Sequence, residues 1–113
     1  MDSNDKPLVW LHGQVKTPPF SQSARLEAVF LRRRLKQGEA LSLPQSRPMP
    51  SIGVRCHELR IRDAEQNWRI IYRMEDDAIL ILEVFSKKSQ TTPKPMIEIC
   101  QQRLKQYERD RQE

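Results

Sequence analysis

The spacing of hydrophobic residues along the chain changes from a helical period to a strand-like one. The run LVWL at residues 8–11 predicts a short first strand. Ser21 then stands where a helix N-cap is favoured, and Gly38 stands where helices commonly end. Between them apolar residues recur every three or four positions and predict a helix over residues 21–37: Ala24, Ala28, Leu31 and Leu35.

Residues 56–88 instead follow a period of two, which predicts three antiparallel strands joined by turns at DAEQN and EDD. Apolar residues alternate with charged ones in the first two of these strands. If the apolar faces coincide, four arginines must share the opposite face. The run AILILEVF is apolar at nearly every position, which is typical of a central strand covered on both sides. The alternation sets His57, Leu59, Ile61, Trp68, Ile70 and Tyr72 against Glu58, Arg60, Arg62, Arg69, Ile71 and Arg73.

The remaining segments complete the predicted architecture. Three prolines in LSLPQSRPMPSIG exclude a continuous helix and indicate an extended surface connection. Thr92 and Pro93 suit an N-cap and a first helical position, and an apolar stripe follows at Met96, Cys100, Leu104 and Tyr107. We therefore predict one α+β domain over residues 1–113. Its mostly antiparallel four-stranded sheet is flanked by helices, in the order strand, helix, three strands, helix.

Composition and charge limit the classes of partner. The chain has 113 residues, of which 37% are hydrophobic, and its formal charge is +5, so it suits a single folded domain that favours polyanions such as nucleic acid. No window is apolar enough for a membrane span, and the start MDSNDKPLVW lacks the features of a signal peptide. We therefore expect a cytoplasmic protein that does not contact the membrane and whose cysteines are reduced.

Four residues are candidate zinc ligands by type: His12, Cys56, His57 and Cys100. Their spacing matches no familiar zinc site. Cys56 and His57 also fall on opposite faces if they share a strand. The sequence therefore predicts no metal and no cofactor.

A face rich in arginine suggests chemistry on phosphate. RNA cleavage without a metal requires removal of the 2′-hydroxyl proton, stabilisation of charge on the scissile phosphate, and protonation of the leaving 5′ oxygen. Guanidinium groups serve the second task, because they offer paired donors to phosphate oxygens. The alternative from pattern alone is a solvated basic face that is inert or only binds phosphates.

Three segments together resemble a known family: SRPMPSIGVRCHELRIRD, WRIIYRM and VFSKKSQTTP. In order and spacing they are similar to the phage-derived branch of the RelE/HigB-type toxins of bacterial toxin–antitoxin systems. The resemblance implies a compact sheet flanked by helices. It also implies an endonuclease that cuts mRNA in the ribosomal A site and is kept inactive by an antitoxin protein from a neighbouring gene.

The resemblance also implies roles for particular residues. Arg60 matches a basic position of the strand that opens the site, and Arg69 matches the arginine that contacts the scissile phosphate. Lys87 and Lys88 match a basic pair at the end of the last strand, of which we expect Lys88 to enter the site. The predicted catalytic residues are Arg60, Arg69, Lys88, Glu58 and Tyr72, and the predicted substrate-binding residues are Arg62, Arg73, Lys87 and Arg47.

The chain departs from its relatives at one point of chemical importance. Where some of them carry a tyrosine after the lysine pair, this chain has Thr91, Thr92 and Pro93. The general base is therefore open, with Glu58 as a possible substitute and Tyr72 as a weaker one. The leading hypothesis is a ribosome-dependent mRNA endoribonuclease toxin. The alternative is a non-catalytic basic module on the same fold that binds RNA, ribosomes or a host protein.

Overall fold

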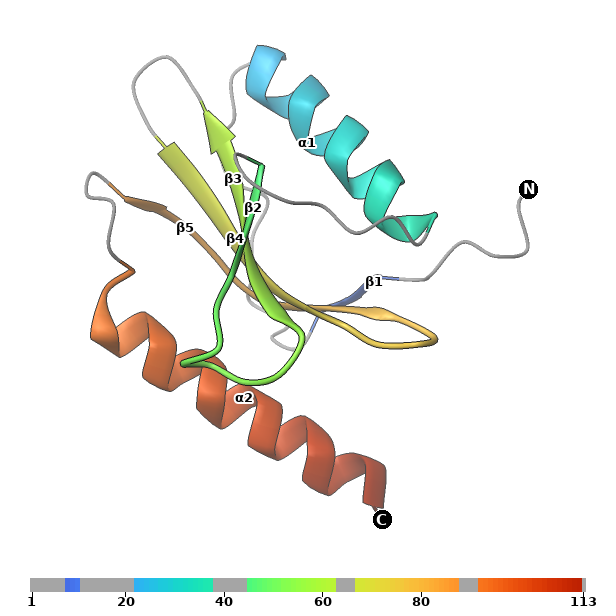
Figure 1. Ribbon diagram of the computed structural model, residues 1–113, viewed down its shortest axis with the longest axis vertical. Coiled ribbons are helices and arrows are strands. Elements are labelled where there is room, and N and C mark those ends of the chain that lie inside the picture. The colour runs from blue at the N-terminus through green and yellow to red at the C-terminus, as the bar shows by residue number, and fades with distance from the viewer. Residues whose placement is uncertain (1–7, 11–21, 38–44, 63–66, 88–91, 113) are drawn as a thin grey trace.

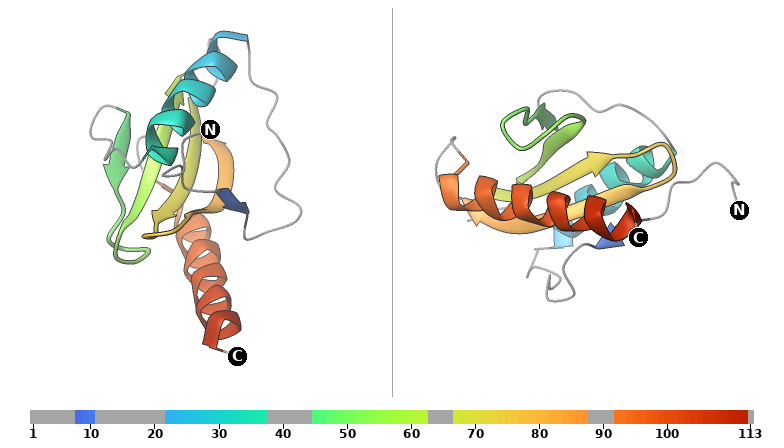
Figure 2. Two further views of the ribbon diagram at one scale, coloured as in Figure 1. Left: turned by 90° about the vertical axis from the view of Figure 1, so that its right-hand side faces the viewer. Right: turned by 90° about the horizontal axis from the view of Figure 1, so that it is seen from below.

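A single sheet lies between two helices in the computed structural model (Figures 1 and 2), which describes residues 8–10, 22–37, 45–62, 67–87 and 92–112. The predicted α+β class and its mostly antiparallel sheet are confirmed. None of the helices described is long and apolar enough to cross a membrane. In chain order the elements are β1 (Leu8–Trp10), α1 (Gln22–Lys36), β2 (Ser46–Pro48), β3 (Cys56–Arg62), β4 (Asn67–Met74), β5 (Ile79–Lys87) and α2 (Lys94–Gln112).

The sheet has the strand order β1-β5-β4-β3-β2. The three long strands form the antiparallel meander that the period of two predicted, and β1 pairs with β5 in parallel. The sequence predicted four strands, and β2 adds a fifth within the proline-rich stretch that we interpreted as a connection. Pro48 is tolerated there because β2 is an edge strand, where a missing N–H costs no ladder bond.

The two faces of the sheet are covered by different helices. Leu31 and Leu35 of α1 pack on the face that carries Leu59, Ile61 and Trp68. This agrees with the helical spacing of the leucines and with the alternation in β3 and β4. Ala24 and Ala28, which belong to the same predicted stripe, lie outside the side chains that the structure describes, as do Ser21 and Gly38.

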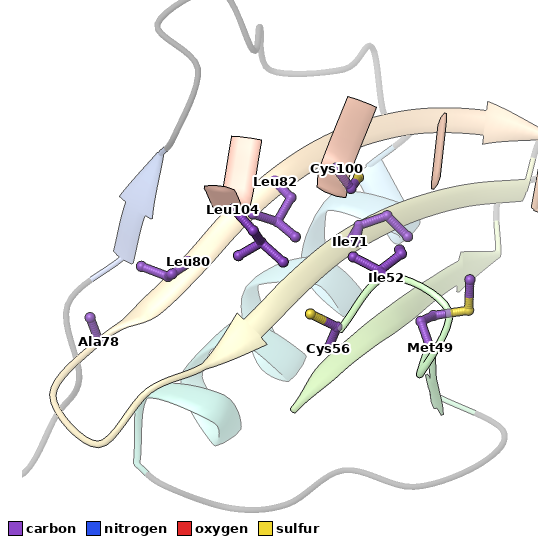
Figure 3. Close-up of a cluster of buried hydrophobic side chains, with 9 residues drawn as sticks. All are labelled: Met49, Ile52, Cys56, Ile71, Ala78, Leu80, Leu82, Cys100 and Leu104. Carbon is purple, nitrogen blue, oxygen red and sulfur yellow. The ribbon is translucent and has the colours of Figure 1, made fainter. Parts of the chain in front are cut away.

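The other face is covered by α2, whose Cys100 and Leu104 lie against the sheet (Figure 3). Ile71 of β4 and Cys56, the first residue of β3, belong to this second core, so the face opposite the first core is not wholly charged. Both cysteines are buried free thiols. Burial raises the pKa of the Cys56 thiol to about 11 and that of Cys100 to about 12.

The last helix begins slightly later than the sequence predicted. The carbonyl of Pro93 accepts hydrogen bonds from the amides of Met96 and Ile97, at 3.0 and 3.3 Å, so Pro93 occupies the N-cap position and Lys94 the first helical one. The hydroxyl of Thr92 donates a hydrogen bond to Glu58 of β3. This contact ties the start of α2 to the sheet.

Candidate active site

A buried carboxylate lies at the centre of the basic face. Glu58 is the third residue of β3, and its side chain is fully buried. Its carboxylate oxygen Oε1 is 3.3 Å from Nε of Arg69 and 3.9 Å from Nε of Arg60, and its other oxygen accepts the hydrogen bond from Thr92. A buried charge of this kind is stable only when it is paired. We refer to Glu58, Arg60, Arg69 and Thr92 as the Glu58 cluster.

The two arginines of the cluster come together because they are cross-strand partners. Arg60 of β3 stands directly opposite Arg69 of β4 in the antiparallel register, so their side chains share one face. Two like charges in that position repel each other, and the carboxylate beside them offsets the repulsion. The predicted sharing of a face by the arginines is therefore confirmed for this pair.

Each guanidinium of the pair has a buried donor atom for which the described residues supply no hydrogen-bond acceptor. Arg69 donates from Nη1 to the carbonyl of Trp68 at 3.1 Å. The Nε atoms of Arg60 and Arg69 are both buried, and neither has a hydrogen-bond partner among the described residues. Glu58 attracts these atoms, but its geometry does not satisfy them as hydrogen-bond donors. Buried donors in this condition favour an additional acceptor, and an anionic one most of all.

The electrostatics of Arg69 reflect this crowding of positive charge. Burial lowers the pKa of its guanidinium, and the charges of Arg60 and Arg47 lower it further, whereas Glu58 raises it. Burial and the two neighbouring arginines thus disfavour the charged guanidinium, and the Glu58 carboxylate favours it. An incoming phosphate would act in the same direction as Glu58 and stabilise the charged form.

Arg47 reaches the site through the strand that the sequence did not predict. It is the register partner of Glu58 across β2 and β3, and its charge acts on Arg69. The amide of Arg60 also donates to the carbonyl of Gln45 at 2.7 Å, which extends the pairing of this edge. Arg62 lies further along β3 and is exposed, opposite Asn67. Both arginines therefore lie on the face of the Glu58 cluster.

The lysine pair is described only in part. The backbone of Lys87 stands opposite Asn67 at the end of β5, in the row that also contains Arg62. That row lies two residues beyond the one that joins Arg60, Arg69 and Phe85. Lys88 lies outside the described residues, so its predicted entry into the site stays a prediction.

Two predicted site residues are not brought to the cluster. Tyr72 lies on the opposite face, in the core under α1, where its hydroxyl is 2.7 Å from that of Ser46 and its ring stacks on His57. Burial raises the pKa of this phenol, so its hydroxyl stays protonated at neutral pH and is not available to accept a proton as a phenolate. The geometry therefore gives no support to Tyr72 as the general base.

Arg73 shares the face of Arg69 but lies at the other end of the sheet. It is the register partner of Cys56 and donates to Glu75 and to Glu108 of α2, the latter at 3.0 Å. Burial alone would lower the pKa of Arg73, but the hydrogen bonds to Glu108 and Glu75 outweigh it and raise the pKa. The structure thus uses Arg73 to hold α2 on the sheet, away from the Glu58 cluster.

One member of the cluster was missed by sequence reasoning. Thr92 follows the lysine pair by four residues, and its type suggested only a helix cap. The contact with Glu58 joins residues 34 apart, and no local pattern encodes it. The available signal was Glu58 itself, a lone acid among arginines on a strand, because a carboxylate in that position requires donors from a neighbouring element.

Comparison with known proteins shows the family of this chain. Residues 19–105 match the family described as phage derived protein Gp49-like (DUF891), and the chain belongs to that family. It is a family of toxin-type proteins similar to RelE and HigB. The match spans α1 and the whole β2–β5 region together with most of α2, and so includes every residue of the Glu58 cluster. No curated protein matches the chain.

Proposed function

We propose that this protein is the toxin of a type II toxin–antitoxin system, a metal-independent endoribonuclease that cuts mRNA on the ribosome. The observation that carries the proposal is the pairing of Arg60 with Arg69 beside one buried carboxylate, with donor atoms left unsatisfied. Membership of a toxin-type family supports the same reading. An antitoxin from a neighbouring gene is the proposed controlling partner.

In this proposal the arginine pair binds the scissile phosphate and stabilises its transition state. The 2′-hydroxyl loses its proton to solvent as its oxygen attacks the adjacent phosphorus. The bond to the 5′ oxygen breaks and that oxygen takes up a proton from solvent, so the products are a 2′,3′-cyclic phosphate and a 5′-hydroxyl end. Negative charge on the phosphoryl oxygens grows along this path, and two fixed guanidinium groups stabilise it more than they stabilise the ground state. Removal of one such donor is expected to cost about 10²-fold to 10³-fold in rate.

Glu58 is assigned to positioning and not to proton transfer. Its carboxylate is fully buried and already holds two arginines and the Thr92 hydroxyl. A general base must come within hydrogen-bond reach of the proton that it removes. A carboxylate in this position instead fixes the guanidinium planes, which lowers the entropy lost when they bind phosphate. Lys88 remains the proposed further cation of the site.

The alternative function is a basic binding module without catalysis. It is favoured by one observation: within the described part of the chain, no histidine, tyrosine or exposed carboxylate joins the Glu58 cluster as an acid or base. Such a module would use the same arginines to bind RNA phosphates. Its binding would weaken with salt, but no strand would be cut.

Mapping of mRNA 5′ ends after brief induction in a bacterial host separates the two functions. The wild type is compared with Arg60→Gln, Arg69→Gln and Lys88→Gln. The toxin hypothesis predicts new 5′-hydroxyl ends within translated frames, and their loss in all three variants. Unchanged mRNA in cells that accumulate folded wild-type protein would contradict it and leave the binding module.

A further inference from the structure

The first helix exposes an apolar row on the side that faces away from the sheet. Leu26 is 66% exposed, Phe30 is 60% exposed and Val29 is 41% exposed. Val29 and Phe30 lie three and four positions after Leu26, so both are its neighbours on one side of α1. Leu31 and Leu35, which pack on the sheet, lie roughly half a turn away around the helix. We refer to Leu26, Val29 and Phe30 as the outer row.

A helix that only covers a sheet does not need the second apolar face that the outer row gives to α1. A helix that borders a core normally carries one apolar stripe and a polar outer side. Here the outer side combines large apolar residues with positive charge, which is the pattern of a protein-binding surface with an apolar centre and a charged rim. By contrast Val54, which is 74% exposed, stands alone in a turn and needs no such explanation.

The rim of the outer row is strongly basic. Arg32 and Arg33 are exposed, Arg34 and Lys36 are half-buried, and Glu27 is the one acidic residue in the sequence of α1. The guanidinium of Arg34 lies 5.8 Å from the centroid of the Phe30 ring, in the range of a cation–π contact. Positive charge therefore surrounds the apolar row, and any occupant must complement both features.

We propose that the outer row binds an amphipathic helix of another protein, with apolar residues along one face and glutamate or aspartate on both sides of them. The apolar face of such a helix covers the outer row, and its carboxylates meet the basic rim. A second copy of this chain fits poorly, because its own α1 would bring the same positive charges face to face. The phosphates of RNA would pair with the basic rim but would have no partner at the apolar centre.

The inference is independent of the proposed nuclease. The outer row lies on α1, which packs on the sheet face opposite to Glu58, Arg60 and Arg69. A helix bound there does not cover the Glu58 cluster. Substitutions in the outer row are therefore expected to leave RNA cleavage unchanged, so failure of one proposal does not imply failure of the other.

The test uses the full chain and synthetic helical peptides of about 15 residues, the length of α1. A peptide with leucines at i, i+3, i+4 and i+7 and flanking glutamates is compared with one in which lysines replace the glutamates. Fluorescence anisotropy measures the Kd. We expect the acidic peptide to bind, and at least about tenfold more tightly than the basic one.

Variants locate the binding to the outer row. Leu26→Ser with Phe30→Ser should weaken the acidic peptide at least about tenfold, whereas the matched exposed variant Val54→Ser should not change it. Circular dichroism of the wild type and both variants is the control for folding.

Four results would overturn the proposal. One is failure of the acidic peptide to bind, and a second is equal binding by the Leu26→Ser/Phe30→Ser chain. A third is a wild-type dimer in light scattering that Phe30→Ser makes monomeric. The fourth is an RNA oligonucleotide whose binding falls in the outer-row variant and that displaces the peptide.

Discussion

Arg60 and Arg69 stand directly opposite each other across β3 and β4, and both direct Nε toward the same buried oxygen of Glu58, at 3.9 and 3.3 Å. Cross-strand arginines would normally repel, and the carboxylate makes their approach possible. The result is a pair of guanidinium groups with fixed positions and unsatisfied donors. This relationship links the fold to the proposed chemistry.

Loss of the carboxylate charge should destabilise the protein. Glu58→Gln leaves two crowded arginines with a weaker acceptor, and we expect the free energy of unfolding to fall by about 2 kcal/mol. Arg69→Gln should lower the free energy of unfolding by a similar amount, because the buried Glu58 carboxylate then loses one of the two arginines that offset its charge. The double variant should lose less than the sum of the two, with a coupling of about 1–2 kcal/mol. Urea denaturation measures all four chains, and strict additivity would contradict a direct Glu58–Arg69 pair.

The hydroxyl of Thr92 should stabilise the cluster through its hydrogen bond to Glu58. Thr92→Val preserves the shape but removes the donor, so we expect a loss of about 1–2 kcal/mol in the free energy of unfolding. Thr92→Ser retains the donor and serves as the control. If valine and serine gave equal stability, the hydrogen bond would have no energetic role.

The two carboxylates that pair with Arg73 should contribute unequally to the free energy of unfolding. The side chain of Glu75 is 9% exposed and that of Glu108 is 55% exposed. Glu75→Gln should therefore lower the free energy of unfolding by about 2–3 kcal/mol, and Glu108→Gln by less than about 1 kcal/mol. Thermal and urea unfolding check this order. The reverse order would contradict the assignment of Arg73 to a mainly buried pair with Glu75.

The buried thiols should make stability fall at alkaline pH. Both stay protonated in the folded protein, with pKa values of about 11 and 12, whereas in the unfolded chain they ionise near 9.0. The unfolded state therefore releases protons first, so stability is complete below about pH 9 and is lost as the pH rises toward the folded values. Each thiol should remove about 1 kcal/mol between about pH 9 and 10.

A chain with Cys56→Ala and Cys100→Ala provides the control for this pH dependence. Its stability at neutral pH should be lower, because the substitutions leave small cavities in the core under α2. Its decline above pH 9 should nevertheless be shallower by about 2 kcal/mol per pH unit. Urea unfolding at several pH values measures both chains, and parallel declines would show that the thiols are not responsible.

The fold was largely predictable because its strands and helices carry strong periodic signals. The alternation in β3 and β4 placed Arg60 and Arg69 on one face, and the leucine spacing of α1 predicted which side meets the sheet. The strand β2 was not predictable, because three prolines and a three-residue length leave no period to detect. Because Arg47 belongs to β2, its position opposite Glu58 was not predicted either.

The candidate site was predictable only in part, for a physical reason. Residues on adjacent strands meet through register, which the alternating pattern constrains, so the arginine pair could be anticipated. The different roles of Arg69 and Arg73 could not be predicted, because the role of Arg73 depends on where the carboxylates of Glu75 and Glu108 lie in three dimensions. The role of Thr92 likewise depends on how α2 docks.

The most direct test of the central claim is cleavage of mRNA on purified, programmed ribosomes by the wild type, Arg69→Gln and Arg73→Gln. The two arginines lie four residues apart on β4, are similarly buried, and are each paired with a buried glutamate. Damage to the fold should therefore affect both variants, and loss of phosphate stabilisation should affect only one. We predict a rate about 10²-fold lower or more for Arg69→Gln, near the wild-type rate for Arg73→Gln, and 2′,3′-cyclic phosphate ends. Equal rates in the two variants, or no cleavage by folded wild-type protein, would contradict the account.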